Sequence, residues 1–159
     1  MRKLCVGAVV VGALLWGSGG AGAVPAGRGP VRGEADLAFH GYVALSDGRV
    51  RVSLTPRNHG PSDVGDATVR LRSSAPLADA GRLPGACVRE GGRGVLCRTG
   101  ALPAGGWGEP LDLVLPLKGG GQEVTLTVDT AWGGGAVDGN PANNHRVVLA
   151  LDTGDSYYF

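Results

Sequence analysis

The sequence predicts an all-β protein folded as an antiparallel β-sandwich of about seven strands. The chain has 30 glycines and 10 prolines, a quarter of its 159 residues, which is about twice the ordinary share. A helix interior tolerates neither residue well, and from Asp36 onward the longest stretch free of both has 12 residues, Ala142 to Thr153. In the remaining stretches apolar residues alternate with polar ones, which is the period of a strand with one buried face.

Residues 1–23 are predicted to be a signal peptide. Met1-Arg2-Lys3 is positively charged, an uncharged run from Leu4 to Trp16 follows, and Ala21-Gly22-Ala23 has the small residues that signal peptidase accepts. As a helix, the run of 13 residues would span roughly 20 Å, short of the ~30 Å hydrocarbon core of a membrane. We therefore expect cleavage after Ala23 and a secreted chain that has no transmembrane anchor after cleavage.

The remaining chain divides into three predicted parts. Residues 24–34 are rich in Pro and Gly without periodicity, so we expect a flexible leader there. The sandwich is expected over residues 35–152, and residues 153–159 are expected to be a C-terminal tail.

Within the sandwich, the predicted strands follow one another in a regular order. Two alternating stretches are separated by the turn residues Ser46-Asp47-Gly48, and a third follows the break at 57–62. A hairpin with two cysteines lies in the Pro- and Gly-dense stretch 73–110, and three more alternations follow it. Six strands and the hairpin make about seven, as is typical of an immunoglobulin-like sandwich. The residues predicted to face the core are Leu37, Phe39, Val43, Leu45, Val50, Val52, Leu54, Val69, Leu71, Leu111, Leu113, Leu115, Leu117, Val124, Leu126, Val128, Val147, Leu149 and Leu151.

Cys87 and Cys97 are predicted to form a disulfide. They are the cysteines that remain after removal of residues 1–23, and an even pair in an exported protein indicates a disulfide. Gly91-Gly92 lies midway between them and suits the tip of a hairpin. Closing a loop of about 11 residues stabilises a fold by roughly 2–3 kcal/mol in the chain-entropy model. The pair lies too close in sequence for the disulfide that joins the two sheets of an antibody-type domain.

The breaks between the strands carry motifs that resemble a known family. In order they are Asn58-His59-Gly60-Pro61-Ser62, Leu83-Pro84, the two cysteines, Leu102-Pro103-Ala104-Gly105 and Asp138-Gly139-Asn140-Pro141-Ala142-Asn143-Asn144. This series resembles the bacterial conserved-repeat domain of unknown function (number eleven), which occurs in secreted and surface proteins, and the related cell-adhesion domain. The resemblance covers about residues 35–152 and implies an immunoglobulin-like sandwich without established catalytic residues.

The motif residues have predicted structural roles. Asn58 and Gly60 are expected to take positive-φ geometries in a loop that switches sheets. Asp138, Asn140 and Asn143 are expected to close the last turn by bonding to neighbouring backbone amides. A Ca²⁺ site in this acidic and amide-rich segment is the alternative, although Ca²⁺ takes 6–8 oxygen ligands and the segment has one carboxylate.

No catalytic residues, cofactor or metal site are predicted. Asp152-Thr153-Gly154 imitates the aspartic-protease motif, but no second Asp-Thr-Gly supplies the other carboxylate. His40, His59 and His145 lie in distant segments, with His40 expected to point outward beside Tyr42, and phosphate-loop and dinucleotide motifs are absent from the sequence. We therefore expect a protein that is not an enzyme.

Charged and aromatic residues supply the candidate contacts with a partner. Arg49, Arg51, Arg70 and Arg72 are expected on outer faces, where they either bind an anionic wall polymer or pair with Asp112, Glu123 and Asp129. With a formal charge of +1 we expect pairing and no binding of nucleic acid. The candidate ligand contacts are Trp107, Trp132, Tyr157 and Tyr158, although packing of the aromatic tail on the sandwich is the favoured interpretation for the two tyrosines.

These observations together favour a secreted, non-catalytic binding module that is associated with the cell surface. Its expected partner is a cell-wall polymer or an extracellular protein, and cell-wall association follows from that expectation. Two alternatives stay open, namely a soluble carrier of a small apolar ligand and a secreted protease inhibitor. A carrier requires a large apolar pocket, whereas an inhibitor requires a protruding rigid loop, for which residues 84–97 are the candidate.

Overall fold

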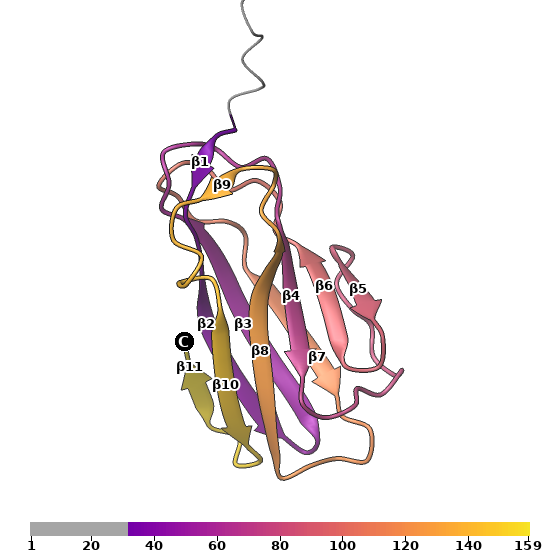
Figure 1. The fold of residues 1–159 in the computed structure, drawn as a ribbon. Helices are drawn as coiled ribbons and strands as arrows, with labels where there is room; N and C mark the ends of the chain where they lie inside the picture. The colour runs from indigo at the N-terminus through magenta and orange to yellow at the C-terminus, as the bar shows by residue number, and fades with distance from the viewer. Residues whose placement is uncertain (1–31) are drawn as a thin grey trace, which may run out of the picture. The chain divides into compact units, whose positions relative to one another are not determined.

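Two antiparallel sheets face each other in the computed structural model, which describes residues 32–159 (Figure 1). The all-β sandwich predicted from the sequence is confirmed. Eleven strands are present in the described residues. They are the six alternating strands, the two strands of the cysteine hairpin and three short strands that the alternation does not predict. The predicted signal peptide, residues 1–23, lies outside the described residues. The predicted leader also lies outside them, except for residues 32–34.

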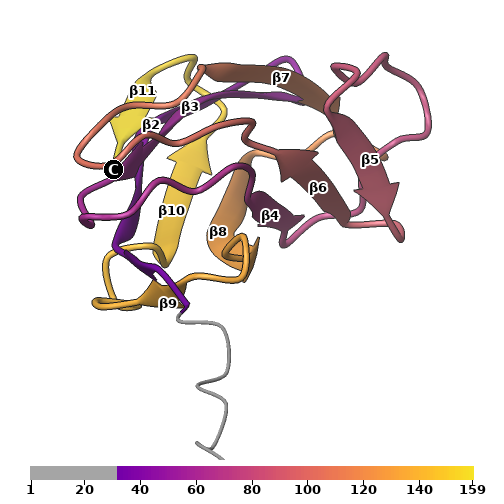
Figure 2. The same cartoon turned by 90° about the horizontal axis from the view of Figure 1, so that it is seen from above.

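The strands form two main layers and one small extra pair. Figure 2 shows the two layers from above. The first layer has the order β11-β2-β3-β7, with the bounds β11 (Ser156–Tyr158), β2 (Leu37–Ser46), β3 (Arg49–Asn58) and β7 (Leu111–Pro116). The second has the order β10-β8-β4-β6-β5, with the bounds β10 (Arg146–Leu151), β8 (Glu123–Trp132), β4 (Thr68–Ser73), β6 (Gly94–Arg98) and β5 (Cys87–Glu90). The extra pair is parallel and joins β1 (Glu34–Ala35) to β9 (Val137–Asp138).

The β2–β3 hairpin has a two-residue turn that fixes its register. Ser46 pairs with Arg49, and the two residues between them, Asp47 and Gly48, have φ values of 52° and 66°. A turn with two positive φ angles matches the twist of a hairpin, and Asp-Gly is a preferred sequence for it. The predicted turn is confirmed, and it determines which residues of β2 and β3 share a face.

The core lies between the inward faces of the two sheets. Phe39, Leu45, Leu54, Leu71 and Leu126 are among its fully buried side chains. The alternation predicted the inward face of every long strand but the last. In those strands one set of alternate positions includes polar or charged residues, so burial of the other set avoids a large desolvation cost.

For β10 the predicted inward face is wrong. Val147, Leu149 and Leu151 are 59%, 51% and 41% exposed, whereas Val148 and Ala150 are buried. The register explains the difference, because Val148 and Ala150 lie opposite the inward-facing Leu126 and Val124 of β8. Both faces of β10 are apolar, so the alternation alone could not select between them. The structure therefore leaves an aliphatic row on the outer face of the edge strand.

Part of the predicted tail belongs to the four-stranded sheet, because residues 156–158 form β11 at its edge. Tyr157 pairs with Val43 of β2 in the antiparallel register of β11. Gly41 and Phe159 exchange two backbone hydrogen bonds, the N–H of Gly41 donating to the oxygen of Phe159 at 3.2 Å and the N–H of Phe159 to that of Gly41 at 3.0 Å. The predicted tail thus packs on the sandwich as an edge strand.

The predicted disulfide between Cys87 and Cys97 is confirmed, with an S–S distance of 2.04 Å. The two residues lie directly opposite each other in β5 and β6, and both side chains are buried against the core. The bond therefore ties the edge strand β5 to its neighbour within one sheet. Gly91, with a φ of 62°, lies in the turn between the two strands.

The expected positive-φ geometry of Asn58 and Gly60 is wrong, since neither residue is among those with positive φ. Gly60 is required for a different reason: a Cβ there would lie 2.5 Å from the Cα of Ala35, far inside contact distance. Asn58 is fully buried, and its side chain makes four hydrogen bonds. The motif serves close packing and buried hydrogen bonding rather than a strained turn.

Candidate functional site

The candidate site lies on the outer face of the four-stranded sheet, where β2 and β3 carry polar side chains. Phe39 and Leu54 face the core, so the alternation turns His40, Tyr42 and Arg57 outward. Arg57 pairs with Ala38, and His40 pairs with Thr55, which lies two residues before Arg57 in β3. Arg57 and His40 therefore lie diagonally across from each other, within reach of one another's long side chains.

A glycine-rich loop brings Trp107 onto this face. The N–H of Asn58 donates to the oxygen of Gly106, and the N–H of Gly108 donates to the oxygen of Pro56, both at 2.9 Å, so the loop lies along the end of β3. Gly108 is required there, because a Cβ would lie 2.3 Å from the Leu102 side chain and 2.9 Å from Pro56. Gly108 thus allows the close approach of the loop to β3 that positions the indole.

The result is a cluster of one aromatic and three basic side chains, which we call the Trp107 cluster: His40, Arg57, His59 and Trp107. The guanidinium carbon of Arg57 lies 4.7 Å from the centre of the indole ring, a cation–π distance. The His40 ring lies 5.2 Å from the Trp107 ring and 6.4 Å from the His59 ring. Trp107 remains 51% exposed, so about half of its side chain is open to solvent.

The electrostatic surroundings of His40 are positive. Burial lowers the pKa of His40 below its ordinary value of 6.5, and the charges of Arg146, His59 and Arg57 lower it further. The three ion pairs within residues 32–159 are Arg70–Glu90, Arg98–Asp66 and His145–Asp129, and none involves the cluster. Two buried nitrogens of the cluster, Nε2 of His40 and Nε of Arg57, have no hydrogen-bond partner in that part of the chain.

The four aromatic residues predicted as ligand contacts occupy three different places. Tyr158 is exposed, and the centre of its ring lies 5.7 Å from the centre of the Tyr42 ring. It therefore extends the face that carries Trp107 and His40. Tyr157 alternates with it and packs against the core. Trp132 ends β8 in the other sheet, opposite Thr68, and is 52% exposed. The structure therefore gathers Trp107 and Tyr158 on one face and separates Trp132 from them.

The predicted pairing of the outward arginines with Asp112, Glu123 and Asp129 is wrong. Arg70 pairs with Glu90 instead, and the ion pairs of the described residues include none of Arg49, Arg51 and Arg72. Nε and Nη2 of Arg70 donate to the two carboxylate oxygens of Glu90 at 2.8 and 2.9 Å, which raises the pKa of Arg70. Of the acids expected to pair with arginines, Asp129 contacts His145 instead.

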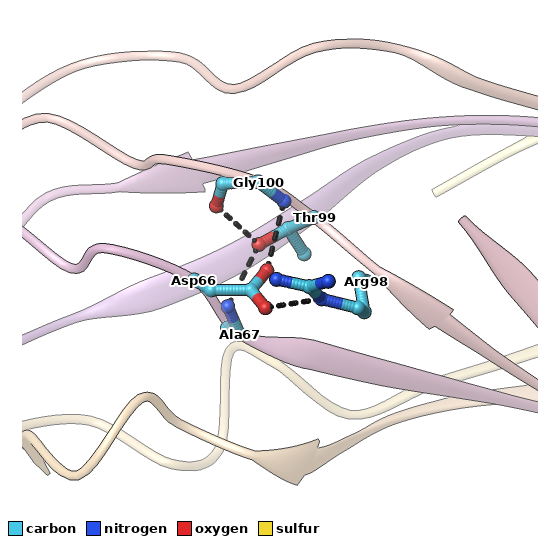
Figure 3. A network of polar contacts seen from close by, with 5 residues as sticks. All are labelled: Asp66, Ala67, Arg98, Thr99 and Gly100. Carbon is cyan, nitrogen blue, oxygen red and sulfur yellow. Dashed lines mark hydrogen bonds and ion pairs between the residues drawn. The ribbon is translucent and has the colours of Figure 1, made fainter. Parts of the chain in front are cut away.

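A second arginine, Arg98, belongs to a network that fastens the loop before β4 to the end of β6 (Figure 3). Asp66 accepts hydrogen bonds from Nε of Arg98 at 2.6 Å and from the N–H of Gly100 at 3.0 Å. Next to it, the N–H of Ala67 donates to the hydroxyl of Thr99 at 3.0 Å. One carboxylate oxygen of Asp66 thus accepts from the guanidinium and the other from a backbone N–H, so the carboxylate has a structural role.

The turn at Asp138 is closed by hydrogen bonds, as predicted for this residue. One oxygen accepts from the N–H of Asn140 at 2.9 Å, and the other accepts from the amide of Asn144 at 2.8 Å and the N–H of Leu37 at 3.2 Å. N–H donors therefore surround the carboxylate that the calcium alternative requires. Across residues 32–159, no group of three or more His, Cys, Asp or Glu residues is close enough to hold a metal ion.

Three hollows on the described surface have volumes of about 250, 300 and 370 Å³. The largest of the three lies on the same outer face as the Trp107 cluster, between Tyr42, Arg51, Asp112 and Val114. The smallest lies beside the Asp138 turn and includes Thr130. In residues 32–159 no helix is long and apolar enough to cross a membrane.

Comparison with known proteins gives only structural similarity. No protein-family model matches the chain, and no curated protein matches it either. The chain is similar to part of β-glucosidase 3B from Thermotoga neapolitana in complex with α-D-glucose, with a TM-score of 0.47 and 14% identity over 79% of this chain. A second structure of that protein, in complex with glucose, gives a TM-score of 0.45 and 16% identity. In both cases the match spans 17% of the other chain.

Proposed function

We propose that this chain is a secreted, non-catalytic module that binds a cell-wall polymer through the outer face of the four-stranded sheet. The observation that carries the proposal is the row formed by Trp107, His40, Tyr42 and Tyr158, with Arg57 beside it. Aromatic rings on a flat sheet offer a large, rigid contact area at low entropic cost, and cations beside them add specific polar contacts. An extended polymer can lie along such a row.

Two features of the chain support export. The N-terminal segment has the three parts of a signal peptide. The Cys87–Cys97 disulfide is stable in the oxidising conditions outside the cytosol. We further propose, from the motifs alone, a relationship to the bacterial conserved-repeat domain.

The two alternatives receive less support from the geometry. A carrier of an apolar ligand needs an enclosed apolar cavity, whereas the three hollows include charged or polar surface residues such as Arg51, Arg98 and Asp138. The inhibitor alternative depends on residues 84–97, most of which form the β5–β6 hairpin at the edge of the five-stranded sheet.

Co-sedimentation with purified cell walls tests the proposal. The secreted chain is mixed with walls of the producing organism at low and high salt, and the bound fraction is measured in the pellet. We expect pelleting that Trp107→Ala and Tyr158→Ala each weaken about tenfold or more, in the range of a lost aromatic contact in an interface.

Trp132→Ala is the matched control, because this tryptophan is equally exposed but lies in the other sheet. Its pelleting should equal that of the unmodified chain. A chain that stays in solution at both salt concentrations would disprove wall binding, and equal losses from the three variants would disprove the assignment to this face.

A further inference from the structure

The Trp107 cluster contains two buried nitrogens that lack a hydrogen-bond partner in the described residues. Nε2 of His40 and Nε of Arg57 are two of the four buried side-chain nitrogens and oxygens without a partner in residues 32–159. Leaving a buried polar group unpaired is costly, so most such groups in native proteins have a partner. Two such atoms lie on neighbouring strands around one tryptophan, and Nε of Arg57 is a donor that lacks an acceptor.

The charge around these atoms is also uncompensated. Arg57, His59 and Arg146 all act on His40, and each disfavours its protonation. Arg146 comes from β10, which packs against β2 at the edge of the sandwich. A partly buried positive group is less screened than a solvated one, so it attracts an anion more strongly.

The acids of the adjoining segments are already engaged elsewhere. Asp36, next to β2, accepts a hydrogen bond from the side chain of Asn143 at 2.6 Å. Asp129, next to the β8 residue that pairs with Arg146, contacts His145. Asp138 accepts three N–H donors. The chain therefore supplies cations here, while Asp36, Asp129 and Asp138 make other contacts.

Trp107 indicates what else the ligand contains. One face of the indole packs on the Arg57 guanidinium, while half of the side chain is exposed. The open part can stack against the C–H face of a sugar ring or polyol chain. Arg57 is partly exposed and His59 is exposed, so both can reach an acidic group on the same ligand.

From these contacts we propose that the Trp107 cluster binds an acidic saccharide or polyol, with the anionic group on Arg57 and His59 and the carbon skeleton on Trp107. The proposal rests on the proposed function and specifies its ligand. Two sources share this chemistry, a polymer of uronic acid with carboxylates and a polyol-phosphate polymer.

Calorimetric titration of the secreted chain with three probes of equal length tests the ligand class. The probes are an oligomer of glucuronic acid, an oligomer of glycerol phosphate and a neutral oligomer of glucose. We expect at least one acidic probe to bind, more weakly at higher salt, and the neutral probe to bind about tenfold or more weakly. Binding of one acidic probe alone identifies the source of the ligand.

Matched variants place the site on the molecule. Arg57→Gln is expected to lower the affinity for the acidic probe by about 10- to 100-fold, in the range of a lost hydrogen bond to a charged group. Arg72→Gln removes an exposed arginine of the other sheet, and its affinity for the acidic probe should be within about twofold of that of the unmodified chain. Thermal unfolding of both variants shows whether each remains folded, and His59→Gln provides a second test if Arg57→Gln does not fold.

The outcomes separate this inference from the proposed function. If walls pellet the chain but the neutral probe binds as well as the acidic ones, or Arg57→Gln and His59→Gln change nothing, the anionic ligand is disproved and wall binding stands. If an acidic probe binds at this site but walls do not pellet the chain, the site stands and the wall assignment fails. If neither walls nor probes bind, both are disproved.

Discussion

Asn58 stabilises three separate segments with one side chain. Its oxygen accepts from the N–H groups of Asp36 and Gly60 at 3.2 and 2.9 Å, and its amide donates to the oxygens of Ser62 and Leu102 at 2.8 and 3.3 Å. All four hydrogen-bonding positions of the amide are therefore used in a site with no access to water.

Asn58→Ala is expected to lower the free energy of unfolding by about 3–5 kcal/mol, because it leaves several buried backbone groups without partners. Urea unfolding followed by tryptophan fluorescence measures the change. Asn140→Ala is the control, since Asn140 is exposed in the other motif and its replacement should change stability by less than about 0.5 kcal/mol. Equal effects of the two substitutions would contradict the role given to Asn58.

His40 makes the stability of the fold depend on pH. Its pKa is lowered below 6.5 by burial first and by Arg146, His59 and Arg57 next. The unfolded chain then binds a proton at a higher pH than the folded chain, so stability is full above about pH 6.5 and falls as the pH drops towards the folded pKa.

We expect the unfolding free energy of the unmodified chain to fall between pH 7 and pH 5 more steeply than that of His40→Gln. The pH dependence of Arg57→Gln should be intermediate in steepness, because this substitution removes one repelling charge and leaves the burial of His40 unchanged. Chemical unfolding at a series of pH values checks the order. Parallel curves for the three proteins would show that His40 does not titrate in this window.

Among the elements, β10 differs from the other strands of its sheet because its outer face is aliphatic. Val147, Leu149 and Leu151 form a row on that face, next to Thr127, Thr125 and Glu123 of β8. Exposed aliphatic residues on an edge strand add little to the stability of the monomer and favour association with other surfaces.

Leu149→Lys is expected to change the unfolding free energy by less than about 0.5 kcal/mol, as for other surface substitutions. The neighbouring substitution Val148→Ala, which removes buried methyl groups, should cost about 2 kcal/mol. Urea unfolding of both variants measures the contrast, and sedimentation velocity shows whether Leu149→Lys reduces self-association. A large loss of stability for Leu149→Lys would mean that Leu149 faces the core.

For the molecule as a whole, the sequence predicts where strands lie but not how they are ordered in the sheets. The positions of β2, β3, β4, β7 and β8 follow from local alternation and from turn residues, which act over a few positions. The neighbours of β4 are β6 and β8, which come later in the chain, and such long-range pairing has no local signal. Short strands such as β1 and β9 are too brief for any periodicity to show.

The candidate site was only partly predictable for the same reason. Trp107 and Tyr158 were expected as contacts from residue type alone, and the outward direction of His40 followed from alternation. The diagonal relation of His40 and Arg57 could have been found from the Asp47-Gly48 turn, because a two-residue turn fixes the hairpin register. The position of the Trp107 loop depends on backbone bonds to β3 and could not be found from sequence.

The pairing of β11 with β2 has a consequence for the timing of folding. Ser156 lies opposite Ala44, and these residues are about 110 positions apart, so synthesis at about 5–20 residues per second separates them by about 5–20 s. Throughout that interval the edge of β2 that pairs with β11 has no partner, and the four-stranded sheet is incomplete. A nascent chain can therefore complete the four-stranded sheet only after residues 156–158 have been made.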